Sequence, residues 1–165
     1  MKTILILGGY GQTGRLLAHH LLGETECRLI LAGRRPERGA ALAAALNEQA
    51  GQDRVTTAHA DATDAAGLTR ALAGVDLVLV ASSTAAHCER VARAVLAAGS
   101  DYLDIQYAAA KVATLQRLTP EIERAGRCFI TDGGFHPGLP AALVCYAAAR
   151  FDRLERANVG SVIAV

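Results

Sequence analysis

Residues 2–14 have the sequence KTILILGGYGQTG, and this stretch decides the fold. Its first part, residues 2–7, is a short apolar run of the kind that forms a buried β-strand. Glycines follow at positions 8, 9, 11 and 14, in two overlapping patterns, GxGxxG and GxxGxxG. Glycine lets the backbone turn tightly and approach a pyrophosphate without a Cβ in the way. A helix that begins at residue 12 would point free N–H groups and the positive end of its dipole at the phosphates.

The glycine loop, residues 8–14, therefore predicts dinucleotide binding, because it lies between a strand and a helix as the fingerprint requires. A tight turn without a ligand is the alternative. A P-loop is disfavoured, since no Gly-Lys-Ser/Thr follows the loop. The predicted cofactor-binding residues of the loop are Gly8, Gly9, Tyr10, Gly11, Gln12, Thr13 and Gly14.

Short apolar runs alternate with longer helical stretches along the rest of the chain. Further strands are expected at 27–32, 54–59, 76–80, 102–105 and 128–131, and helices at 12–22, 36–50, 65–73, 84–98, 108–118 and 139–150. Several of the strands are almost continuously apolar, which is typical of a parallel sheet covered on both faces. The alternation predicts a Rossmann-type doubly wound α/β domain over residues 1–150, in which ligands bind at the carboxyl ends of the strands.

The composition limits the classes of protein to which the chain can belong. Its 165 residues fit one domain, and 52% apolar with 20% charged residues exclude a disordered chain. A net charge of +1 gives no reason to expect nucleic acid or a membrane as a partner. The four cysteines, none in a CxxC spacing, are expected to be reduced and mostly buried: Cys27, Cys88, Cys128 and Cys145. With no apolar run of about 20 residues, the expected location is cytoplasmic.

The residues after the second predicted strand bear on the choice of dinucleotide. NAD-binding sheets usually place Asp or Glu there to hold the ribose hydroxyls. This chain has Arg34 and Arg35 instead. Guanidinium groups fit a 2′-phosphate, so the sequence favours NADP over NAD. The alternative is a pair of solvent-exposed arginines near the start of a helix.

Two further loops follow predicted strands at the same edge of the sheet. Asp61, with Ala62 beside it, could accept a hydrogen bond from the adenine amine, or it could only cap the next helix. Ser82 and Ser83 are small enough to let the chain pass close to the nicotinamide ribose, or they could serve as plain helix caps. Both alternatives stay open for both loops.

With these motifs in view, the chain resembles the NAD(P)-binding domain of the saccharopine dehydrogenase family over residues 2–150. The resemblance rests on GGYGQTG (8–14), AGR (32–34), DATD (61–64), DLVLVASS (76–83), AAGSDYLDI (97–105) and above all GFHPGLP (134–140). The glycine loop is shared by many families, whereas the turn at 134–140 is more specific.

The resemblance implies a pyridine-nucleotide oxidoreductase acting at a C–N bond of a small amino-acid-derived substrate. It assigns the pyrophosphate to the glycines of the loop, the adenosine ribose or its phosphate to Arg34, the adenine to Asp61 with Ala62, and the nicotinamide ribose to Ser82 and Ser83. It also implies a second domain beginning at 151–165 and a homodimer in the full-length form. The chain alone is then expected to bind NADP without turnover, and its apolar tail, 159–165, to form a strand that needs a partner.

Two other functions remain open at this stage. Tyr107 and Lys111 form a YxxxK pair, the spacing of short-chain reductases, although no serine lies where such an enzyme needs one and Lys111 is expected to be solvated. A non-catalytic NADP-sensing module is the other alternative. His136 is a candidate for proton transfer or substrate contact. Asp104 is a candidate for orienting the substrate or the nicotinamide amide, with a helix cap as the alternative. No metal site is expected, because no histidine or cysteine pair has ligand spacing.

Overall fold

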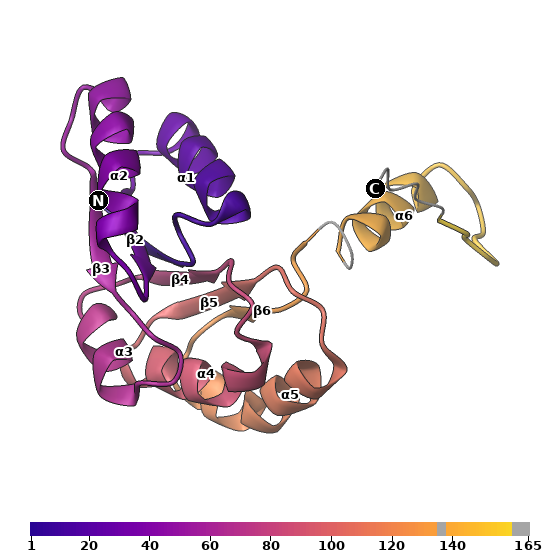
Figure 1. Ribbon diagram of the computed structural model, residues 1–165. Helices are drawn as coiled ribbons and strands as arrows, with labels where there is room; N and C mark the ends of the chain where they lie inside the picture. The colour runs from indigo at the N-terminus through magenta and orange to yellow at the C-terminus, as the bar shows by residue number, and fades with distance from the viewer. Residues whose placement is uncertain (135–137, 160–165) are drawn as a thin grey trace.

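A computed structural model describes residues 1–134 and 138–159 of the chain. Its centre is one six-stranded parallel sheet with the strand order β3-β2-β1-β4-β5-β6 (Figure 1). The strands are β1 (Thr3–Leu7), β2 (Arg28–Gly33), β3 (Val55–His59), β4 (Leu77–Val80), β5 (Asp101–Asp104) and β6 (Phe129–Ile130). This order is that of the doubly wound Rossmann-type fold, so the predicted fold class is confirmed.

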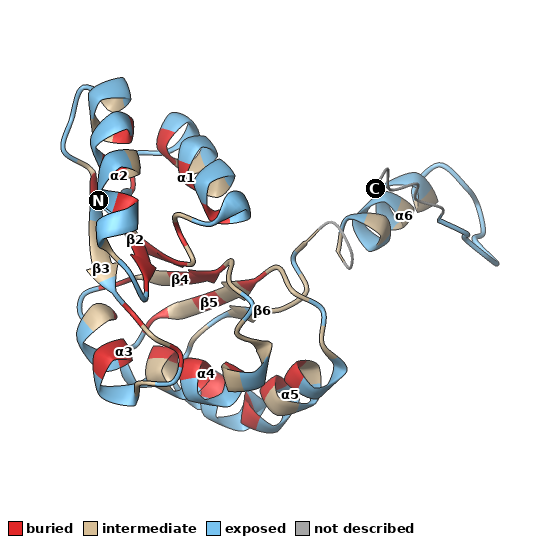
Figure 2. Ribbon diagram, in the orientation of Figure 1, coloured by how far each residue is buried: buried red, intermediate tan, exposed pale blue. Residues whose placement is uncertain are grey.

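Helices cover both faces of the sheet (Figure 1). α1 (Gln12–Glu24) and α2 (Glu37–Ala50) lie on one face, and α3 (Ala65–Ala71), α4 (Cys88–Ala97) and α5 (Ala109–Arg124) lie on the other. Side chains of β1 alternate between the two cores: Leu5 and Leu7 pack under α3, α4 and α5, and Ile6 packs under α1 and α2. Figure 2 shows the buried residues concentrated on the strands and on the inward faces of the helices.

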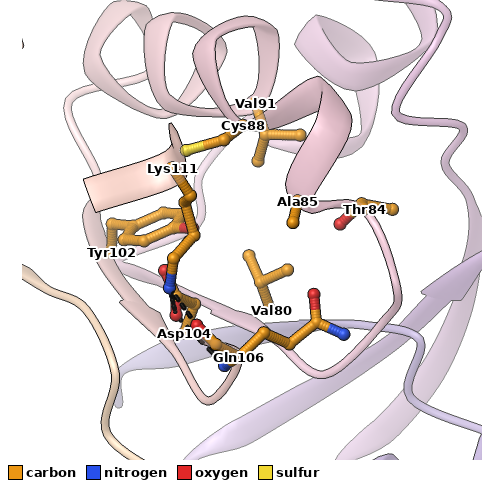
Figure 3. A pocket seen from close by; sticks show the side chains of 9 residues that line it. All are labelled: Val80, Thr84, Ala85, Cys88, Val91, Tyr102, Asp104, Gln106 and Lys111. Carbon is orange, nitrogen blue, oxygen red and sulfur yellow. Dashed lines mark hydrogen bonds and ion pairs between the residues drawn. The ribbon is translucent and has the colours of Figure 1, made fainter. Parts of the chain in front are cut away.

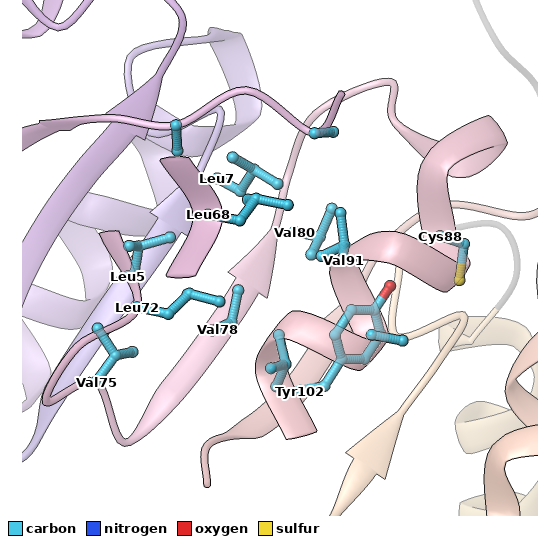
Figure 4. Close-up of a cluster of buried hydrophobic side chains, with 14 of the residues drawn as sticks. Leu5, Leu7, Leu68, Leu72, Val75, Val78, Val80, Cys88, Val91 and Tyr102 are labelled. Carbon is cyan, nitrogen blue, oxygen red and sulfur yellow. The ribbon is translucent and has the colours of Figure 1, made fainter. Parts of the chain in front are cut away.

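The larger of the two cores lies beneath α3, α4 and α5 (Figure 4). Leu5 and Val78 come from neighbouring strands, and Leu68 and Val91 from the helices that cover them. Burying one such aliphatic side chain stabilises a fold by about 1.5–3 kcal/mol. The continuous apolar runs of the central strands are thus explained, because both of their faces contribute to a core.

The reversal of strand order lies between β1 and β4. After β3 the chain returns past β1, and β4 pairs with the free side of β1. In the register, Leu7 lies opposite Ala32 of β2 and Val80 of β4. The loops that follow β1, β2 and β4 therefore begin at the same edge of the sheet, which is where ligands of such sheets bind.

The observed elements differ from the predicted ones mainly at helix ends. The helix predicted at 84–98 starts with a separate 3-10 turn, η1 (Ala85–His87), before α4. The helix predicted at 108–118 continues to Arg124 and contains Pro120. The sequence suggested an end before the proline, but Leu118 and Ile122 on either side of it both pack into the larger core, and this packing outweighs the missing backbone donor.

The cysteines and the C-terminal segment depart further from expectation. Cys27 and Cys88 are buried, but Cys128 and Cys145 are exposed, so the expectation of mostly buried thiols is wrong for two of the four. α6 (Leu139–Ala148) is apolar on all sides and has no buried residue. Within 138–159 no strand follows α6, and residues 160–165 of the predicted terminal strand lie outside the described residues. Among the helices in the described parts, none combines the length and apolarity that a bilayer crossing requires.

Candidate dinucleotide-binding site

The glycine loop joins β1 to α1 and packs tightly against its neighbours. Gly8 has φ +90°, and a Cβ there would lie 2.9 Å from the Cβ of Ser82. A Cβ on Gly14 would collide with the carbonyl oxygen of Gly8 and lie 2.8 Å from the Cα of Gly9. Gly11 differs, because a Cβ there would meet only the Gly8 oxygen, at 3.1 Å. Gly8 and Gly14 are thus needed for the turn itself. Gly11 is exposed, and because it has no side chain, the solvent-facing side of the loop is open at this position.

The N-terminus of α1 is open toward this loop. Gly11 is the N-cap residue, with extended backbone, and no side chain in the described part of the protein caps the helix. The first-turn N–H groups of Gln12, Thr13 and Gly14 have no acceptor within the helix. The first turn also carries no acidic residue that would repel an anion. A loop without side chains beside open helix N–H groups fits a pyrophosphate.

A cleft of about 580 Å³ opens beside the loop at the carboxyl edge of the sheet. That volume is in the range of small-molecule sites. Its walls come from the four segments that the sequence singled out, namely the glycine loop and the turns after β2, β3 and β4. Of the predicted residues, those lining it are Gly8, Tyr10, Gly11, Arg34, Arg35, Asp61, Ala62, Ser82 and Ser83. The cleft lining does not include Gly9, which packs against Leu31, nor Gln12, Thr13 and Gly14.

Three arginines from the turn after β2 and the start of α2 line the cleft, namely Arg34, Arg35 and Arg38. All three are exposed, and none forms an ion pair with another described residue. Arg38 was missed by the sequence analysis. Its position could have identified it, because it lies in the first turn of α2, three residues after Arg35, and its N–H bonds the Arg35 carbonyl.

Asp61 lines the cleft from the turn after β3. Its carboxylate accepts hydrogen bonds from the backbone N–H and the hydroxyl of Thr63, both at 2.8 Å. These bonds, with smaller contributions from Arg34 and His59, hold the pKa of Asp61 below its ordinary value. Asp64 is the N-cap residue of α3, as expected, but its side chain makes no capping hydrogen bond, and the Asp61 carboxylate bonds Thr63 and does not cap the helix.

The turn after β4 packs against the glycine loop. The hydroxyls of Ser82 and Thr84 lie 3.2 Å apart, and the backbone N–H of Thr84 donates to the carbonyl of Ser82 at 2.7 Å. The half-buried Ser82 meets Gly8 across the switch point, whereas Ser83 is exposed to the cleft. Both serines are therefore placed where a ligand crossing the switch point would pass.

A buried polar cluster lies at the carboxyl ends of β5 and β6, and Figure 3 shows its members Tyr102, Asp104 and Lys111. Asp104 and Lys111 are 1% and 3% exposed. The ammonium of Lys111 contacts Asp104 Oδ1 and the carbonyl of Gln106, and it donates to Asp132 Oδ1 at 2.9 Å. Asp104 Oδ2 accepts hydrogen bonds from Tyr102 at 2.8 Å and from Thr131 at 3.0 Å.

The expectation that Lys111 is solvated is wrong. It lies on the inward face of α5, at helical spacing from Leu115, Leu118 and Ile122, all of which are buried. Its three ammonium protons are matched by three acceptors, which is why a charged side chain can be buried there. Tyr107 by contrast is 67% exposed. The two side chains of the YxxxK pair therefore lie apart, Lys111 in the interior and Tyr107 at the surface.

Asp104 likewise lies in the interior and not at a surface that a substrate could reach. Both of its oxygens are hydrogen-bonded within the cluster, and it does not cap a helix. Burial and the neighbouring Asp104 raise the pKa of Tyr102, which keeps the phenol neutral. Burial also raises the pKa of Cys88, which borders an adjacent cavity of about 10 Å³, room for about one water. His136 lies outside the described residues.

Comparisons with known proteins agree with this geometry. The family profile described as saccharopine dehydrogenase NADP binding domain matches residues 4–130. A search of curated protein sequences found no match. Among solved structures, the apo saccharopine dehydrogenase (L-Glu forming) of Saccharomyces cerevisiae is similar with a TM-score of 0.70 and 24% identity, over 91% of this chain and 32% of that one.

Two further structures share the fold. Triphenylmethane reductase of Citrobacter sp., complexed with NADP(H), has a TM-score of 0.56 and 22% identity, over 76% of this chain and 48% of that one. An NADPH-dependent quinone oxidoreductase of Escherichia coli has a TM-score of 0.57 and 23% identity, over 89% of this chain and 53% of that one. The chain thus spans about a third of the yeast protein and about half of the other two.

Proposed function

Because the chain belongs to the saccharopine dehydrogenase NADP binding domain family, we propose that it binds NADPH in the cleft and supplies the cofactor-binding part of an oxidoreductase. The substrate class is a small amino-acid-derived compound with a reacting C–N bond. The cofactor supplies the hydride chemistry when bound. The chain's own residues bind and orient it.

The observation that carries this proposal is the set of three exposed arginines that line the cleft, none of which forms an ion pair within residues 1–134 and 138–159. An acidic residue after β2 would hold the hydroxyls of NAD, but Arg34 and Arg35 occupy that turn and Arg38 lies beside them. Guanidinium groups bind phosphate with charge-assisted hydrogen bonds. The glycine loop at the neighbouring wall is shaped for the pyrophosphate. The two phosphate-bearing parts of NADPH therefore have complementary partners in one cleft.

The geometry disfavours the short-chain reductase alternative. In such an enzyme the lysine must act beside the tyrosine hydroxyl and the cofactor. Here the ammonium of Lys111 is buried and bonded to three acceptors, while the Tyr107 side chain is exposed. An NADP-sensing module would use the same cleft as the proposed oxidoreductase, and the two differ only in whether a substrate is turned over.

We further propose that a second domain covers α6 and supplies most of the substrate site. Leu143 and Tyr146 on this helix are 52% and 70% exposed, and Phe151 beyond it is 61% exposed. A helix that is apolar on all sides is normally buried. In a full-length homodimer, this helix and the segment after it would pack against that further domain.

Arg34→Ala tests the assignment of the arginines. Loss of one charge-assisted hydrogen bond to a phosphate weakens binding by about 1.5–3 kcal/mol, so we expect the NADPH dissociation constant to rise roughly 10- to 150-fold. The NADH constant should change by less than about twofold, because NADH has no 2′-phosphate. Isothermal titration calorimetry with both cofactors measures the two constants.

Arg28→Ala is the matched control, since Arg28 is an exposed arginine at the opposite end of the same strand, β2. It should leave both constants unchanged. If Arg34→Ala weakened the binding of NADPH and NADH equally, or weakened the binding of neither, the role given to Arg34 would be contradicted.

A further inference from the structure

Tyr10 is the one aromatic side chain of the glycine loop, and it contacts the turn that carries the arginines. Its hydroxyl oxygen accepts a hydrogen bond of 2.8 Å from the backbone N–H of Arg35. Its ring packs, partly buried, against the core beneath α1 and α2. The side chain thus spans the distance between the loop after β1 and the turn after β2.

Two glycines make room for this ring. A Cβ on Gly33 would collide with the Tyr10 hydroxyl oxygen and lie 2.7 Å from its Cζ, and a Cβ on Gly39 would lie 2.9 Å from its Cδ1. Neither glycine has a positive φ, so the backbone conformation does not require glycine at either position. At Gly33 the ring excludes a side chain, and at Gly39 it does so together with the Cγ2 of Thr57, which would lie 3.1 Å from the added Cβ. Gly33 ends β2 and Gly39 lies in the first turn of α2, so the ring is held from both sides of the arginine turn, residues 34–38.

The hydrogen bond to Arg35 acts at the start of that turn. The carbonyl of Arg35 in turn accepts the N–H of Arg38 at 3.0 Å. Fixing the Arg35 backbone therefore also fixes the direction from which Arg35 and Arg38 extend into the cleft. Long arginine side chains lose less conformational entropy on binding a phosphate when the backbone that carries them is already held in place.

We infer that Tyr10 is a positioning residue that sets the preference for NADPH over NADH, by holding the arginine turn in register with the glycine loop. This inference rests on the proposed function of the cleft. It assigns Tyr10 no direct part in the chemistry. A purely structural role in the loop would change the affinities for both cofactors alike, whereas a role in holding the arginines changes their ratio.

Tyr10→Phe removes the hydroxyl and keeps the ring. We expect the ratio of the NADH to the NADPH dissociation constant to fall about 3- to 10-fold, the effect of one neutral hydrogen bond, through weaker NADPH binding with NADH changed less than about twofold. Calorimetry with both cofactors measures the ratio. Tyr146→Phe is the matched control, because it removes an exposed tyrosine hydroxyl that also bonds an arginine, on α6. It should leave the ratio unchanged.

A second pair of variants tests the mechanism. Gly33→Ala should displace the ring and lower the ratio of the NADH to the NADPH dissociation constant at least as much as Tyr10→Phe does. In a Tyr10→Ala background, where the ring is gone, the same change should lower this ratio no further. Thermal melts establish that each variant is folded. The inference would be overturned if Tyr10→Phe left the ratio of the two dissociation constants unchanged, or weakened the binding of both cofactors equally. It would also be overturned if Gly33→Ala lowered that ratio as much in the Tyr10→Ala background as in the wild type. A wild-type protein with no NADPH preference would instead overturn the proposed function, and the inference with it.

Discussion

Gly11→Val should abolish measurable NADPH binding while the protein stays folded. Gly11 is exposed beside the N-terminus of α1, and an added Cβ meets only the Gly8 oxygen, so the fold can accept the side chain. The valine methyl groups would occupy the space in which the pyrophosphate approaches the backbone. Losing two charge-assisted hydrogen bonds costs at least about 3 kcal/mol, which raises the dissociation constant more than roughly 100-fold.

Gly23→Val provides the control for this variant. Gly23 lies in the same helix near its far end, and nothing lies within 4 Å of a Cβ built there. Gly11 is the extended N-cap of α1 and Gly23 lies in its last turn, so neither valine enters a core, and thermal melts should show that both variants stay folded. Normal NADPH affinity in Gly11→Val, measured by calorimetry, would show that the cofactor does not use this loop.

Lys111→Met should lower the free energy of unfolding by about 3–5 kcal/mol, because it leaves the buried carboxylate of Asp104 and the partly buried carboxylate of Asp132 without their cation. Asp104 is 1% exposed and cannot regain water in the folded state. The loops after β5 and β6 are held together by Lys111 through Asp104 and Asp132, so this edge of the sheet should loosen first. Urea unfolding followed by circular dichroism measures the loss.

Lys2→Met is the comparison for a surface ion pair. Lys2 bonds Asp76 at 2.6 Å, but its side chain is 80% exposed. Exposed pairs contribute about 0–1 kcal/mol, so this variant should unfold almost as the wild type does. If the two methionine variants lose the same stability, the buried cluster does not hold the edge of the sheet.

The features that could be predicted from the sequence are the local ones. Nearly continuous apolar runs identified β1, β2 and β4 within one residue, since a strand covered on both faces needs an apolar residue at nearly every position. The glycine pattern identified the loop because only glycine fits at Gly8 and Gly14. The resemblance to the saccharopine dehydrogenase family is confirmed over residues 4–130.

The features that sequence reasoning missed depend on residues that meet only in the folded sheet. Lys111 was expected at the surface because a lone charge usually is, and its partner Asp132 lies 21 positions away. Parallel pairing of β5 with β6 brings Asp104 and Asp132 to the same edge of the sheet, where Lys111 of α5 contacts both. Tyr10 and Arg35 are separated by 25 positions and meet because β1 and β2 are neighbours. Neither contact has a local signature.

The purified wild-type protein should bind NADPH in preference to NADH, and calorimetric titration with each cofactor measures the two affinities. The three arginines in place of an acid predict that NADPH binds roughly 10- to 150-fold more tightly, the effect of one charge-assisted contact to the 2′-phosphate. Equal affinities, tighter binding of NADH, or no heat of binding with either cofactor would contradict the account.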